Sequence, residues 1–170
     1  PLPDIGGDQY LSGRTLTVGD GKTLALSTLA NDRSVTSPSA GGGSDPTLVG
    51  ASLVVVNPSS GETGSFALPA SDWKARRGRN GTTAYRYSAS KPSCHVDLAV
   101  GKLQARCSGG TGLTLDEATQ GTLAVRLDVG SMRYCMRFAG TVATDRARTV
   151  RRPGAFRTTG AAAPDACDPQ

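Results

Sequence analysis

Apolar and polar residues alternate with a period of two along much of this chain, which is the pattern of half-buried β-strands. The clearest case runs from Cys94 to Cys107. When this segment folds back about its midpoint, one face is apolar and carries Cys94, Val96, Leu98, Leu103, Ala105 and Cys107. The polar face then places His95 opposite Arg106, and the two cysteines are close enough to bridge. The pattern predicts an antiparallel hairpin closed by a Cys94–Cys107 disulfide.

Similar patterns predict further strands on both sides of this hairpin. Residues 123–129 and 132–138 alternate around the turn Gly130-Ser131. Residues 14–18 and 22–29 form a second predicted hairpin around loop 19–21, which aligns Leu16 with Leu24. A helix over residues 22–32 is the competing interpretation of the latter segment.

Several shorter patterns complete the predicted elements. The apolar run 51–57 is typical of a strand buried on both faces, and residues 64–68 return beside it. Residues 83–88 place Tyr85 and Tyr87 on one face, and residues 113–115 predict a short strand. The basic, glycine-containing segment 74–81 is predicted to be an exposed loop.

About eight to ten short strands with frequent turn signals predict an all-β fold, a single antiparallel β-sandwich stapled by two disulfides. Residues 1–12 are predicted to be an extended N-terminal segment, residues 13–143 the sandwich, and residues 144–170 an Arg-rich C-terminal tail. Cys135 lies on the arginine-bearing side of its strand, away from the apolar face. Its bridge to Cys167 would therefore clamp the tail across the outer face.

Composition limits the class of protein. The chain has 170 residues, of which 37% are hydrophobic and 19% charged, and no run approaches the ~20 apolar residues that a membrane span needs. Four cysteines without a Cys-x-x-Cys pair, and a single histidine, favour two disulfides over a zinc site. We therefore expect a secreted or cell-surface protein whose signal peptide has been removed.

Two interpretations fit the net charge of +5. It indicates an anionic partner, or it follows from the coding bias of a GC-rich genome, because arginine outnumbers lysine and aspartate outnumbers glutamate. Nucleic acid is not the expected partner.

Several segments resemble a disulfide-containing, β-rich domain of exported proteins of environmental bacteria. The resemblance covers about residues 13–167 and implies export and two disulfides, but it brings no catalytic residues. The segments that carry it are Asp45-Pro46-Thr47-Leu48, Leu68-Pro69-Ala70 with Trp73, Tyr85-x-Tyr87, Gly101-Lys102-Leu103 between Cys94 and Cys107, Thr114-Leu115-Asp116, Arg133-Tyr134-Cys135, Phe138-x-Gly140-Thr141-Val142 and Ala163-Pro164-Asp165-Ala166-Cys167.

The candidate catalytic groups are few. His95 is the only histidine, and the hairpin puts it on an exposed strand face rather than beside a serine and a carboxylate. Glu62 and Glu117 lie in predicted turns and not across a cleft. We expect no enzyme, no cofactor and no metal. Calcium binding stays open for the loop aspartates, which lack EF-hand spacing: Asp20, Asp32 and Asp45.

Two functions fit these features. The first is a structural subunit of an extracellular filament or surface layer, which binds itself by exchange of a terminal segment carrying Leu2, Ile5 and Leu11. The alternative is an adhesion module for carbohydrate or another polyanion. Its candidate contacts are Trp73, Arg76, Arg77 and Arg79, and Tyr85 and Tyr87 could add to them. The alternative interpretation places Trp73 and the two tyrosines in the core and the arginines in a solvated loop.

Overall fold

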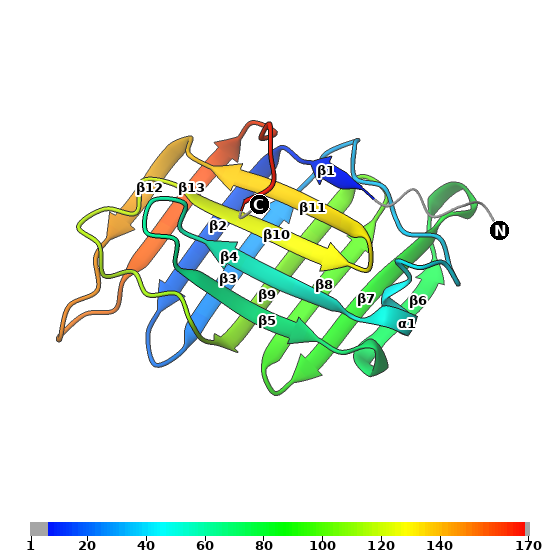
Figure 1. Cartoon of the computed structure of the whole chain (residues 1–170), viewed down its shortest axis with the longest axis horizontal. Coiled ribbons are helices and arrows are strands. Elements are labelled where there is room, and N and C mark those ends of the chain that lie inside the picture. Colours follow the sequence, from blue (N-terminus) through cyan, green and yellow to red (C-terminus); the bar gives the residue numbers. More distant parts are fainter. Residues whose placement is uncertain (1–6, 169–170) are drawn as a thin grey trace.

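The chain folds into two β-sheets that pack face to face, as seen in the computed structural model, which describes residues 7–168 (Figure 1). The sheet with five strands lies in front of the sheet with eight strands in this view, and the larger sheet extends past the smaller one at both ends of the long axis. The predicted all-β sandwich is confirmed.

The larger sheet is antiparallel throughout. Its strands in spatial order are β12 (Thr141–Arg146), β13 (Ala155–Ala161), β2 (Gly13–Asp20), β3 (Leu24–Ala30), β9 (Lys102–Gly110), β8 (Ser93–Ala99), β7 (Thr83–Ser90) and β6 (Trp73–Arg77).

The smaller sheet is antiparallel except at one edge, where β1 pairs with β11 in parallel. Its strands in spatial order are β1 (Asp8–Tyr10), β11 (Met132–Phe138), β10 (Leu123–Val129), β4 (Ala51–Val56) and β5 (Thr63–Leu68). Three short helical turns connect the strands of the described region: α1 (Pro46–Val49), η1 (Ala70–Asp72) and η2 (Arg79–Gly81). None of these helices has the length and hydropathy to cross a membrane.

One continuous hydrophobic core fills the space between the sheets. The apolar face of each alternating strand contributes to it, which is why the period-two pattern was informative. Its largest fully buried side chains are Tyr85, Tyr87, Tyr134, Phe66, Phe138 and Phe156.

Two predicted hairpins have the predicted register. Cys94 pairs with Cys107 and His95 with Arg106 in the β8–β9 hairpin, and the predicted disulfide is present. Residues 123–129 and 132–138 form the β10–β11 hairpin around Gly130-Ser131. The apolar run in β4 is flanked by β5 and β10, as expected of a strand inside a sheet.

The predicted register of the first hairpin is wrong. Its strands are present and the competing helix is not, but Leu16 pairs with Thr28 and the turn lies at residues 21–23. The strand continues through Asp20 because this buried side chain accepts hydrogen bonds from backbone N–H groups elsewhere in the fold. The turn is therefore displaced two residues along the chain.

Three other expectations also need correction. Leu113 and Leu115 are buried, but residues 113–115 pair with no strand, and the backbone of Leu115 is bonded to Asp20 and to Arg148 instead. Most of segment 74–81 belongs to edge strand β6 and to η2 rather than to a free loop. The described region holds thirteen strands instead of the predicted eight to ten.

The predicted boundary at residue 144 is also wrong. Residues 141–161 form β12 and β13 inside the larger sheet, and Phe156 is fully buried. Only the last described residues lie across the outer face of the smaller sheet, where Cys167 is bonded to Cys135 as predicted. The ion pair between Arg137 and Asp168 fastens the same segment.

Candidate functional site

Trp73 is a core residue and not a ligand contact. It is the first residue of β6, is 4% exposed, and donates from Nε1 to the carbonyl of Leu68 at 3.1 Å. Its ring lies 5.3 Å from that of Tyr87. Tyr85 is buried as well. Of the two interpretations of Trp73 and the tyrosines, ligand contacts or core residues, the structure supports the core, whereas the arginines that follow Trp73 are exposed.

These arginines line a hollow at the end of the larger sheet. It has a volume of about 550 Å³, and its charged residues are Arg76, Arg77, Arg79 and Lys102. We call it the basic hollow. Lys102 begins β9, so the fold brings it beside residues more than twenty positions earlier in the chain. No carboxylate lines the hollow.

The floor of the basic hollow is made of small side chains. Arg76 on β6 pairs with Ala84 on β7, and Lys102 on β9 pairs with Ala99 on β8. Two alanines therefore separate the two cations across the sheet. Since neighbouring strands are about 4.8 Å apart, the backbones of Arg76 and Lys102 are about 14 Å apart, which leaves open space above the alanines.

The turn that carries Arg79 is held by hydrogen bonds within it. Gly78 donates to the carbonyl of Thr82 at 2.7 Å, and Thr82 donates to the carbonyl of Arg79 at 3.0 Å. Asn80 and Gly81 adopt positive φ angles of 53° and 73°, which let the chain reverse direction here. Arg79 is therefore presented from an ordered turn.

The cations of the hollow differ in how they are paired. Arg76 contacts Asp97 at 3.3 Å, and Arg86 contacts the same carboxylate at 3.0 Å. Arg77, Arg79 and Lys102 have no ion pair among the described residues. These exposed cations are available to an anionic ligand.

Charge is concentrated in this part of the chain. Residues 73–110, which contain strands β6–β9, hold eight Lys or Arg and one Asp, a net charge of +7. The rest of the chain holds eleven Lys or Arg and thirteen Asp or Glu, a net charge of −2. The positive charge of the protein is therefore a local property of one end of the larger sheet.

The N-terminal segment is part of the fold where it is described. Strand β1 pairs with β11 of the same chain, and Asp8 forms an ion pair with Arg133 at 2.5 Å that raises the pKa of this arginine. Leu11 is fully buried in the core, so it is not free to contact another subunit from this conformation. Leu2 and Ile5 lie outside the described residues.

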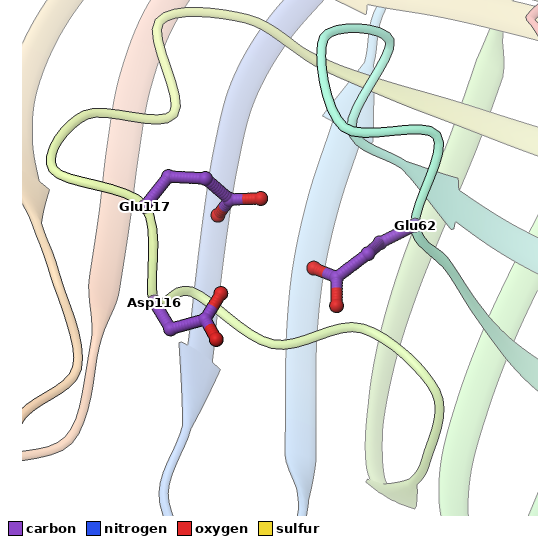
Figure 2. A group of neighbouring side chains, drawn as sticks. All are labelled: Glu62, Asp116 and Glu117. Atoms are coloured by element: carbon purple, nitrogen blue, oxygen red, sulfur yellow. The ribbon is translucent and has the colours of Figure 1, made fainter.

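Three carboxylates meet at the other end of the molecule: Glu62, Asp116 and Glu117 (Figure 2). Glu62 follows β4, and the other two residues lie in the segment between β9 and β10. One oxygen from each lies within 4.8 Å of the others, and the hydroxyl of Thr114 donates to both Glu62 and Asp116. The sequence places Glu62 and Glu117 in separate turns, and nothing in it indicates that these turns meet.

The loop aspartates organise the backbone. Each of the three accepts two backbone N–H bonds. The hydroxyl of Ser34, followed by the backbone N–H groups of Ser12 and Ser34, lowers the pKa of Asp32 to about 2. These bonds give the three carboxylates a role in fixing the surrounding backbone. The bonds come from Leu115 and Gly154 to Asp20, from Ser12 and Ser34 to Asp32, and from Gly41 and Thr47 to Asp45.

Comparison with protein-family models, with curated proteins and with solved structures gave no match.

Proposed function

We propose that this protein is an exported, non-enzymatic binding module that holds acidic polysaccharide in the basic hollow. The observation that carries the proposal is the separation of charge, with a net +7 on the segment that forms the hollow and −2 on the rest of the chain. Arginine side chains bind carboxylate and sulfate groups through paired N–H donors, so Arg77 and Arg79 suit these groups. The two disulfides are consistent with an oxidising compartment.

The burial of the aromatic side chains favours polysaccharide over nucleic acid. Seven of the eight aromatic residues are buried, and the exposed one, Tyr10, lies on the smaller sheet. Proteins that bind single-stranded nucleic acid stack bases on exposed aromatic rings, and readers of duplex DNA commonly insert a helix into a groove. The basic hollow offers charge without a stacking surface.

Salt-dependent binding tests the proposal. The affinity for heparin and for polygalacturonate would be measured over a range of salt concentrations, with duplex DNA as comparator. We expect R77S/R79S to weaken binding and to make the slope of log K against log salt shallower by about 1.5, because two cations no longer displace counterions. The matched control R14S/R33S loses the same charge at exposed positions outside the hollow.

Equal effects of the two double variants would refute the hollow as the site. Tighter binding of duplex DNA than of both polysaccharides would refute the ligand class. Either result is interpretable because all four substituted arginines are exposed and are not expected to alter the fold.

Self-assembly is a second candidate, now in the form of an exchange of β1 between copies. The observation that favours it is that β1 has only three residues, forms the edge of the smaller sheet and pairs there with β11 alone, so the same contacts can form between two chains. Asp8 and Arg133 are register partners on neighbouring strands, close enough for a disulfide in D8C/R133C. Monomers on a non-reducing gel would exclude exchange, and covalent dimers or ladders would support it.

A further inference from the structure

A second hollow lies on the outer face of the larger sheet, about 460 Å³ in volume. It exists because Gly19 pairs with both Ala25 and Ala155, so three neighbouring strands carry almost no side-chain bulk at this level. The neighbouring set of paired residues carries larger side chains. His95 pairs with Arg106, and both side chains are exposed and line the hollow. The second hollow is therefore a shallow depression over small side chains, bordered by a cationic arginine and a histidine.

The lining of the second hollow suits an acidic sugar. It contains no carboxylate, and its polar side chains besides His95 and Arg106 are the hydroxyls of Thr17, Ser27, Ser93 and Ser108. Hydroxyl groups exchange hydrogen bonds with sugar hydroxyls, and the arginine attracts a carboxylate or a sulfate. The exposed apolar floor accommodates the carbon skeleton of a sugar ring.

The two hollows share strands β8 and β9 and open on the same face of the larger sheet. Lys102 lines the basic hollow and Arg106 lines the second hollow, and both lie on β9 at positions that share one face. Four residues of a strand span about 13 Å. Arg86 and its partner Asp97 lie on β7 and β8 in the row between these positions. One linear chain can therefore contact both hollows.

We infer that the two hollows form one extended site, in which a linear acidic polysaccharide runs from the basic hollow to His95 and Arg106. This inference rests on the proposed function, and it adds that recognition depends on chain length. An oligosaccharide shorter than the separation of the hollows contacts only one of them, whereas a longer one gains the second set of contacts.

A length series of heparin oligosaccharides tests this inference, running from below the ~13 Å separation of the hollows to at least twice that length. Two variants alter the second hollow in different ways. R106S removes its arginine, and A25Y fills it with an exposed aromatic side chain that strands tolerate well, without a change of charge. The matched controls are R33S and A67Y, at exposed positions outside both hollows.

We expect R106S to weaken the binding of long oligosaccharides about two- to five-fold, the range of an exposed charge contact, and to leave short ones unchanged. A25Y should reduce the same length-dependent gain, and the controls should not. If R106S and A25Y match their controls at every length while R77S/R79S still weakens binding, the extended site is wrong and the basic hollow stands. If R77S/R79S also has no effect, the proposed function itself fails.

Discussion

Asp20 is the buried carboxylate on which the connection between β2, the 111–122 segment and β13 depends. It is 3% exposed, and its two oxygens accept the backbone N–H groups of Leu115 at 2.7 Å and Gly154 at 2.6 Å. Both donors belong to buried residues. Asp20→Ala leaves two buried N–H groups without an acceptor, at about 1–3 kcal/mol each, so we expect a loss of about 2–6 kcal/mol.

Asp20→Asn separates the loss of one acceptor oxygen from the loss of both. The amide keeps one acceptor oxygen and turns its NH₂ group toward the other N–H, so we expect a loss of about 1–3 kcal/mol. Guanidinium unfolding with the disulfides intact measures both losses as a shift of the midpoint. The control Asp165→Ala removes an exposed carboxylate and should stay within about 0.5 kcal/mol of the unaltered protein.

Hydrogen exchange locates the effect. The amides of Leu115 and Gly154 should lose protection in Asp20→Ala before the core strands do, because their acceptor is gone. A loss below about 1 kcal/mol, with both amides still protected, would refute the reasoning.

Two further predictions concern Trp73 and Asp32. Trp73→Ala should lower the free energy of unfolding by about 3–5 kcal/mol, yet leave polysaccharide affinity unchanged while the protein is folded; a selective loss of affinity would contradict the buried role. For Asp32, whose folded pKa of about 2 lies below the ordinary value of 3.8, the stabilisation is present above pH 4 and is lost as the pH falls toward 2. Because this carboxylate is only partly buried and solvent screens its interactions, we expect about 1 kcal/mol, so the stability gap between Asp32→Asn and the unaltered protein should close over that range. A gap that stays constant from pH 6 to pH 2 would contradict it.

Local pattern predicted the elements whose partners lie close in sequence. The β8–β9 and β10–β11 hairpins were predictable to the residue, because a short turn fixes the register and alternation fixes the buried face. The first hairpin was misjudged by two residues because the partners of Asp20 lie far along the chain. The place of β13 between β12 and β2 was not predicted, since pairing of distant strands leaves no local signal.

The candidate site shows the same division. Arg76, Arg77 and Arg79 form an evident basic run in the sequence, which predicts them as contacts to a polyanion. Trp73 was grouped with them because it is adjacent in sequence, but strand alternation turns it into the core. Lys102 was missed, because it joins the basic hollow only through the pairing of four strands.

The sequence by itself determined the all-β class, the pairing of the cysteines and the faces of the central hairpins, because these depend on period-two alternation and short turns. Tertiary structure decided the strand order, the burial of Leu11 and Trp73, the meeting of the three carboxylates and the two hollows on the larger sheet. These features depend on contacts between distant segments, where burial and hydrogen bonding to remote backbone groups outweigh the local preference of each residue.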